Sequence, residues 1–136
     1  MSNRHKILLI EPDLLLATIY KEHLNAHKYN VRVVGGVQKA IYEIDKLRPD
    51  LVILELQLST HNGYEFLYEL RSYSEWQNIP VLVHSMVPLD DLNLDTNVSS
   101  ELGIIGYLYK PNTSLSKLLY EINNYFQLAL DETNRN

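Results

Sequence analysis

The chain has 136 residues, of which 46% are hydrophobic and 21% are charged, so it can bury one core but is too short for two ordinary domains. It contains no cysteine, which excludes a disulfide scaffold, a cysteine-based zinc site and a cysteine nucleophile. The formal charge of -5 argues against broad binding to nucleic acid, because that function needs clustered lysine and arginine.

The aliphatic runs of the chain are far too short to span a bilayer. The first six residues lead straight into a strand-like run and lack the apolar segment of a signal peptide. We therefore expect a cytoplasmic protein with no membrane contact.

Short apolar runs alternate with segments of helical periodicity along most of the chain. The runs are bounded by proline and glycine, as is typical of buried strands, and the segments between them repeat apolar residues at spacings of three and four. In chain order we expect strand 6–10, helix 14–27, strand 31–34, helix 37–47, strand 51–54, helix 63–72, strand 81–83, a short helix within 87–102, strand 104–108 and helix 113–130. This alternation predicts an α/β fold in which helices cover both faces of a parallel sheet.

Polar side chains follow the predicted strands at their carboxyl ends, which is where ligands bind in an open parallel sheet. They are Glu11 and Asp13 after the first strand, Glu55 after the third, His84 and Ser85 after the fourth, and Tyr109 and Lys110 after the fifth. Three carboxylates, a hydroxyl and a lysine at one edge predict a site for a cation or a phosphoryl group.

The order and spacing of these segments resemble the receiver domain of two-component response regulators. The matching stretches are residues 7–13, 49–58 with Asn62-Gly63, 79–85 and 106–111, and the likeness covers about residues 5–130. The resemblance implies a flavodoxin-like, three-layer fold with five parallel strands in the order 2-1-3-4-5. It also implies one receiver-like domain over residues 1–130, followed by a frayed polar tail at 131–136.

The functional residues of the family can be carried over by position. The resemblance implies an acidic pair after the first strand that holds Mg²⁺, and an aspartate after the third strand that accepts a phosphoryl group from a histidine kinase. Ser85 matches the hydroxyl position of the family, and Lys110, followed by a proline, matches its lysine. Tyr107 matches the aromatic switch position.

Two positions depart from the family pattern. The phosphoacceptor position is Glu55 instead of aspartate, and the second member of the acidic pair is Pro12. The extra methylene of glutamate moves the carboxylate by roughly 1.5 Å, and a displacement of about that size can cost on the order of 100-fold in rate. Pro12 offers no side-chain oxygen to Mg²⁺.

Asp13 has two interpretations in this setting. Together with Glu11 and Glu55 it would supply the carboxylates of a metal site, if one exists. It also precedes a run of three leucines, so its simpler role is the N-cap of the first predicted helix, and this is the role we favour.

These departures predict a degenerate receiver that is not phosphorylated in the ordinary way, is not an enzyme and needs no cofactor, with Mg²⁺ binding weakened by Pro12. Glu55 is expected to pair with Lys110 and hold one fixed conformation. One alternative is a receiver that still accepts phosphate, at Glu55 or Asp13, with relaxed metal binding. A flavodoxin-like cofactor binder is disfavoured because Glu11-Pro12-Asp13 would repel a phosphate.

The expected partners are a histidine kinase or another signalling protein, with no nucleic acid and no membrane. In the receiver family the surface of helix 4, strand 5 and helix 5 is the usual contact face, so homodimerisation there is a further possibility. Tyr107, Tyr109 and Tyr120 are expected on or near this face.

Three histidines remain outside this scheme. His23 and His27 continue the apolar face that Leu16, Ile19 and Tyr20 are expected to form. Two histidines four apart can share a metal ion, but no third ligand is evident, so we interpret them as a helix end that packs partly against the sheet. His84 is interpreted as a histidine at the edge of the core rather than as a catalytic base.

Overall fold

The computed structural model describes residues 4–58, 62–88 and 100–134. The strands are β1 (Lys6–Ile10), β2 (Asn30–Val34), β3 (Leu51–Leu54), β4 (Val81–Ser85) and β5 (Ile104–Tyr109). The helices are α1 (Leu14–Ala26), α2 (Val37–Leu47), α3 (Gly63–Ser72) and α5 (Leu115–Asn134), with short 3-10 helices η1 (Ser74–Trp76) and η3 (Lys110–Asn112).

The five strands form one parallel sheet in the order β2-β1-β3-β4-β5. This confirms the predicted flavodoxin-like fold. The central strands β1, β3 and β4 are buried along almost their whole length, because helices cover both faces of the sheet. The strands therefore read as continuous apolar runs in the sequence.

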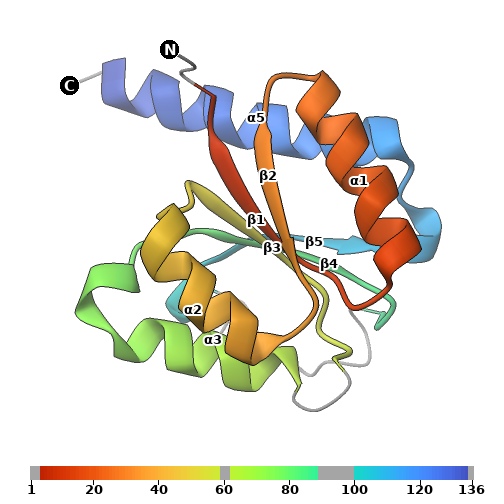
Figure 1. The fold of residues 1–136 in the computed structure, drawn as a ribbon. Coiled ribbons are helices and arrows are strands. Elements are labelled where there is room, and N and C mark those ends of the chain that lie inside the picture. The colour runs from red at the N-terminus through yellow and green to blue at the C-terminus, as the bar shows by residue number, and fades with distance from the viewer. Residues whose placement is uncertain (1–3, 59–61, 89–99, 135–136) are drawn as a thin grey trace.

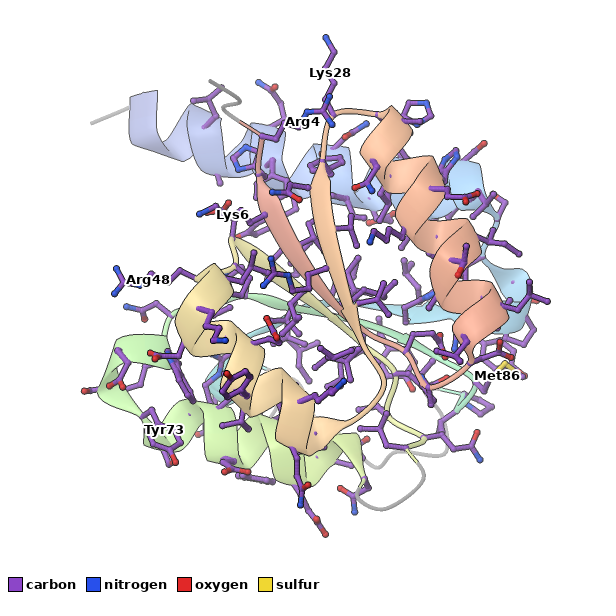
Figure 2. All side chains as sticks on the ribbon, in the orientation of Figure 1. Arg4, Lys6, Lys28, Arg48, Tyr73 and Met86 are labelled. Atoms are coloured by element: carbon purple, nitrogen blue, oxygen red, sulfur yellow. The ribbon has the colours of Figure 1, made fainter. Side chains whose placement is uncertain are left out.

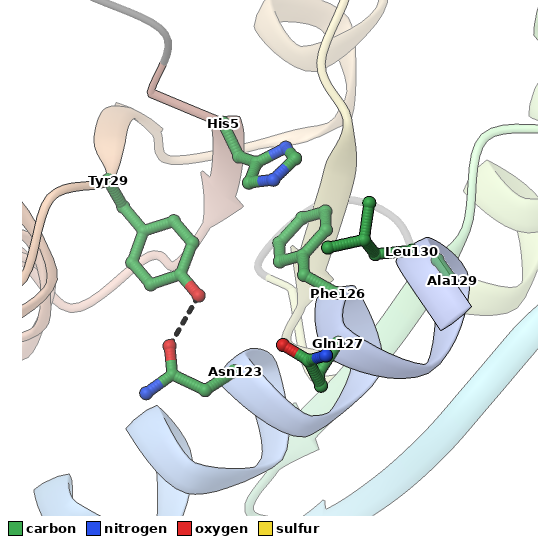
Figure 3. Close-up of a pocket in the computed structure, with 7 residues that line it drawn as sticks. All are labelled: His5, Tyr29, Asn123, Phe126, Gln127, Ala129 and Leu130. Carbon is green, nitrogen blue, oxygen red and sulfur yellow. Dashed lines mark hydrogen bonds between the residues drawn. The ribbon is translucent and has the colours of Figure 1, made fainter. Parts of the chain in front are cut away.

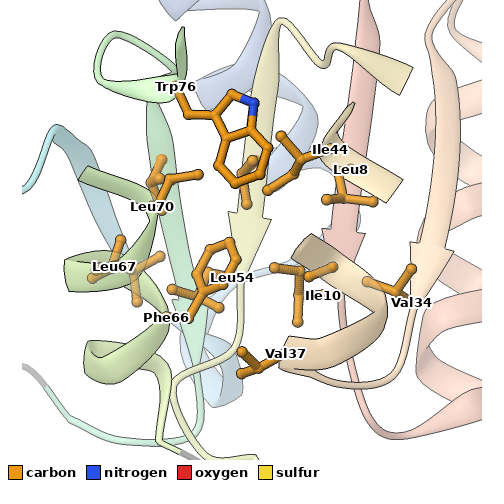
Figure 4. Packing of buried hydrophobic residues seen from close by; sticks show 14 of the residues in the cluster. Leu8, Ile10, Val34, Val37, Ile44, Leu54, Phe66, Leu67, Leu70 and Trp76 are labelled. Atoms are coloured by element: carbon orange, nitrogen blue, oxygen red, sulfur yellow. The ribbon is translucent and has the colours of Figure 1, made fainter. Parts of the chain in front are cut away.

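The helices form two layers, with α2 and α3 on one face of the sheet and α1 and α5 on the other (Figure 1). The core under α2 and α3 is built around the fully buried Phe66, Leu67 and Leu70 (Figure 4). The core under α1 and α5 is built around Leu24, Leu118 and Ile122. Because both faces are packed, the carboxyl edge of the sheet is left as the place for a polar site.

The turns that follow the strands are set by local hydrogen bonds. Asp13 is the N-cap of α1, since its Oδ1 accepts from the amides of Leu15 and Leu16 at 3.0 and 3.1 Å. This confirms the N-cap interpretation of Asp13. Asn62 caps α3 in the same way through Glu65 N at 2.9 Å.

Several predicted boundaries and positions are wrong. Ile19 is 39% exposed and does not belong to the buried face of α1, which consists of Ala17, Tyr20 and Leu24. The C-terminal helix continues to Asn134, so the tail predicted at 131–136 is helical over its first four residues. The short helix expected within 87–102 lies largely outside the described residues.

Candidate functional site

The strand ends bring the predicted polar residues together at one edge of the sheet. Backbone hydrogen bonds continue the ladder past the strands: Glu11 N donates to Val34 O at 3.0 Å and Glu55 N to Ile10 O at 3.1 Å. Both carboxylates are therefore held at the ends of neighbouring strands. Glu11 and Glu55 are only 2% and 3% exposed, so they need buried partners.

Lys110 supplies that partner. Its Nζ donates to Glu11 Oε1 at 2.6 Å and to Glu55 Oε1 at 2.7 Å, and its side chain is buried. The ion pair predicted between Glu55 and Lys110 is thus present, and Glu11 joins it. Burial disfavours the ammonium, yet the hydrogen bonds to Glu11 and Glu55 outweigh it and raise the pKa of Lys110 above its usual value.

The Glu55 carboxylate accepts hydrogen bonds from four donors. Oε1 accepts from Lys110 Nζ and from Met86 N at 3.0 Å. Oε2 accepts from the Ser85 hydroxyl and from Gln57 N at 3.0 Å. Burial opposes ionisation of Glu55, but these four hydrogen bonds outweigh it and hold the pKa of this carboxyl below its usual value.

The sequence does not indicate that Met86 and Gln57 donate to Glu55, because the donors are backbone amides and the side chains of these residues do not reveal them. Their positions do offer a signal: each lies one or two residues beyond a site residue, in the turn after a buried strand. Gly63 allows this turn to be tight, since a Cβ there would lie 2.8 Å from Leu56 Cα. Its amide donates to Leu56 O at 2.9 Å.

A chain of hydrogen bonds leads from the carboxylates to β5. Val87 N donates to Ser85 Oγ at 3.1 Å, and the Tyr107 hydroxyl donates to Val87 O. Tyr107 therefore reaches the segment that follows Ser85, although it comes from the neighbouring strand. Tyr109 is half-buried, whereas Tyr120 on α5 is 60% exposed.

Asp13 lies at the rim but does not join the carboxylate cluster through its side chain. Its carboxylate caps α1, and its amide donates to Glu11 Oε2 at 3.2 Å. Within the described residues, the structure contains no group of three or more His, Cys, Asp or Glu side chains arranged to hold a metal ion. Glu11 and Glu55 are instead joined by Lys110.

His84, which belongs to strand β4, lies beside this cluster. It is 1% exposed, its ring meets the Tyr20 ring edge-to-face at 5.0 Å, and neither ring nitrogen has a hydrogen-bond partner within the described part of the chain. Burial and the nearby Lys110 charge lower the pKa of His84 to about 4. His84 is therefore a neutral core residue, buried more deeply than the sequence suggested.

A pocket of about 530 Å³ lies at the opposite, amino-terminal end of the sheet (Figure 3). His5 stacks on Phe126 with 3.9 Å between the ring centroids, and Tyr29 donates to Asn123 Oδ1. The pocket lies apart from the carboxylates. None of the described helices is both long enough and apolar enough to cross a membrane.

Comparisons with known proteins agree with this arrangement. The chain is 32% identical over 126 residues to the sensory transduction protein BceR of Halalkalibacterium halodurans, covering 88% of this chain and 52% of that protein. It is 29% identical over 130 residues to the response regulator protein GraR of Staphylococcus aureus, covering 93% of this chain and 55% of that protein. The chain thus spans about half the length of these curated relatives.

Solved structures show the same fold. A CheY-like receiver domain protein of Methanospirillum hungatei matches with a TM-score of 0.81 at 18% identity, over 96% of this chain and 99% of that one. The BeF3-activated receiver domain of Klebsiella pneumoniae RstA matches with a TM-score of 0.73 at 27% identity, over 87% and 95%. The family model of the response regulator receiver domain matches residues 7–123. The chain therefore belongs to the response regulator receiver domain family of two-component signalling.

Proposed function

We propose that this receiver domain is atypical: it is not phosphorylated in the ordinary way and acts through protein–protein contacts. The observation that carries the proposal is the closure of Glu55. A carboxylate has about four lone-pair sites. Lys110, Met86, Ser85 and Gln57 supply four donors to them.

This closure opposes attack on a phosphoryl donor. A nucleophile needs a free lone pair aimed at the phosphorus, and both oxygens of Glu55 already accept hydrogen bonds, one each from the buried side chains of Lys110 and Ser85 and one each from a backbone amide. The Lys110 ammonium also lowers the basicity of the carboxylate, as the lowered pKa of Glu55 indicates. Breaking these bonds in a buried site would cost several kcal/mol, on the order of 1–3 for each donor left unpaired.

The residues present do not fit a strong Mg²⁺ site. Oε1 of Glu11 accepts from Lys110, and its Oε2 accepts from Asp13 N. Pro12 contributes no side-chain oxygen, and the Asp13 carboxylate is used to cap α1. Mg²⁺ prefers six oxygen ligands in near-ideal geometry, whereas the carboxylates here surround an ammonium.

The domain then transmits its signal through contacts that its surface makes with another protein. Leu14 and Leu15, which begin α1 beside the site, are 76% and 71% exposed. Met86, which directly follows β4 and is labelled in Figure 2, is 47% exposed. Apolar side chains exposed around a closed site favour contact with another protein over catalysis. The partner is a histidine kinase or another signalling protein of the cytoplasm, or a second copy that binds through β5 and α5. The helix 4 part of that face lies outside the described residues.

Intact-mass analysis after incubation with acetyl phosphate and Mg²⁺ tests the proposal. We expect no phosphoryl adduct on the natural chain. The double variant Pro12→Asp and Glu55→Asp, which restores the acidic pair and the aspartate of the family, serves as the positive control and is expected to gain one adduct. An adduct on the natural chain that disappears in Glu55→Gln would instead make this a phosphorylatable receiver.

A further inference from the structure

We propose that His23 and His27 form a two-histidine binding site for a divalent transition metal at the C-terminal end of α1. The two residues are one helical turn apart, so their side chains are neighbours on the helix surface. Their ring centroids are 4.7 Å apart and the ring planes are inclined by 50°. This site is separate from the carboxylate cluster and does not depend on how that cluster works.

The separation of the rings fits a shared ion. A nitrogen about 2.0 Å from the metal places its ring centroid about 3.1 Å from it, so two rings lie about 4.4 Å apart at a 90° ligand angle and about 5.1 Å apart at the tetrahedral angle. The observed 4.7 Å falls between these values. Little movement of the backbone is therefore needed for both rings to reach one ion.

The ring nitrogens are in a suitable state for coordination. His27 Nδ1 lies 2.8 Å from His23 O, and since a carbonyl only accepts, Nδ1 donates and the Nε2 lone pair of His27 is left available. His23 Nε2 is buried and has no hydrogen-bond partner within the described residues. A buried ring nitrogen without a partner calls for a ligand, and a metal ion bound with His27 would supply it.

The donor set determines the class of metal. Imidazole nitrogens suit Cu²⁺, Ni²⁺ and Zn²⁺, and affinity for a given site is highest for Cu²⁺. The described residues provide no third side-chain ligand. Water must complete the coordination sphere. Because only a neutral imidazole can coordinate, binding is expected to weaken as the pH falls.

Titration of the full chain with Cu²⁺ by calorimetry and electron paramagnetic resonance tests this site. We expect one Cu²⁺ held by two imidazole nitrogens, and a rise in Tm with Cu²⁺ because the ion binds only the folded helix. Both effects should be lost in His27→Gln and in His23→Gln. His5→Gln, which removes a histidine outside the pair, should keep them.

Circular dichroism and NMR distinguish the loss of the metal site from misfolding of a variant. His27 is exposed, so His27→Gln should retain the circular dichroism spectrum of the natural chain. In the natural chain, Zn²⁺ should shift the imidazole ¹⁵N resonances of Nε2 in both His23 and His27. The proposal is overturned if His27→Gln binds Cu²⁺ as the natural chain does, or if Zn²⁺ shifts neither resonance.

Discussion

At the scale of single residues, Lys110 offsets the free-energy cost of burying two carboxylates. Its ammonium lies within 2.7 Å of one oxygen of Glu11 and one of Glu55, and all three groups are buried. The sequence predicted the partnership of Glu55 with Lys110 because both follow strands that end at the same edge. It could not predict that the Met86 and Gln57 amides complete the hydrogen bonding of the Glu55 carboxylate, since backbone donors depend on the path of the turns.

Replacing Lys110 by methionine tests this pairing. Removing one partner from a buried ion pair costs about 3–5 kcal/mol, so urea denaturation of Lys110→Met at pH 7 should show a loss of that size. Protonation of the carboxylates removes the unpaired charge, so the loss should shrink towards pH 4. Lys39→Met, at an exposed position on α2, is the control and should change little. An equal stability of the two variants at pH 7 would contradict the pairing.

His84 predicts a pH dependence of stability. Its pKa in the folded chain is about 4, because burial and the Lys110 charge disfavour the imidazolium, against an ordinary value of 6.5. The unfolded chain therefore binds a proton that the folded chain does not, and stability falls as the pH drops from 6.5 towards 4. Between pH 7 and pH 5 the loss from this group is about 2 kcal/mol.

The variant His84→Leu isolates that contribution. Leucine has a similar volume and does not titrate, so its unfolding free energy should change less between pH 7 and pH 5 than that of the natural chain. The window lies above the ordinary pKa of carboxyl groups, and the pKa of Glu55 is lowered further by its hydrogen bonds, so Glu55 contributes little to it. An unchanged difference between the two pH values would show that His84 does not remain neutral in the folded chain.

At the scale of elements, the predictions succeed where the apolar pattern is continuous. Strands β1 and β3 and helices α2 and α3 have the predicted bounds. Strand β4 runs two residues further than predicted, through His84 and Ser85, because these polar residues are buried by the site and interrupt the apolar pattern. The 3-10 helices η1 and η3 were not predicted, since a single turn leaves no periodicity to detect.

The turn after β3 depends on Gly63, which begins α3. A Cβ at this position would lie 2.8 Å from Leu56 Cα, so the backbone that carries Glu55 must shift in Gly63→Ala. We expect a loss of about 1–3 kcal/mol in unfolding free energy, as for other overpacked sites. Gly35→Ala is the matched control, because nothing lies within 4 Å of a Cβ there. Equal effects of the two substitutions would show that the turn is not tight.

At the scale of the whole molecule, two distinct features lie at opposite edges of the sheet. The carboxyl edge holds the closed cluster of Glu11, Glu55 and Lys110, and the amino edge holds the aromatic pocket around His5 and Phe126. The parallel sheet, its strand order and the described helices on its two faces were predicted from the alternation of elements and from the family resemblance. The contact face expected on β5 and α5 stays a prediction. The exposure of single side chains could not be predicted, because it depends on how the helices pack against the sheet, as the misplaced Ile19 shows.

Tyr120 tests the proposed contact face of β5 and α5. If a second copy or a partner binds there, Tyr120→Ala should weaken the association by roughly tenfold, as expected for an aromatic residue that contributes about 1.4 kcal/mol. Tyr68→Ala is the control, since Tyr68 is exposed to nearly the same extent, 61% against 60%, but lies on α3. Sedimentation equilibrium measures the self-association. The face is not used if both variants associate as the natural chain does.

The central claim is that Glu55 is closed by Lys110, Ser85 and two backbone amides and so does not take up a phosphoryl group. An amide NMR titration with Mg²⁺, followed by beryllofluoride as a mimic of that group, tests it most directly. We predict that the resonances of Glu55, Met86 and Lys110 stay in place through both additions. Saturable shifts at these residues, spreading through Val87 to Tyr107, would contradict the claim and identify an active phosphorelay receiver.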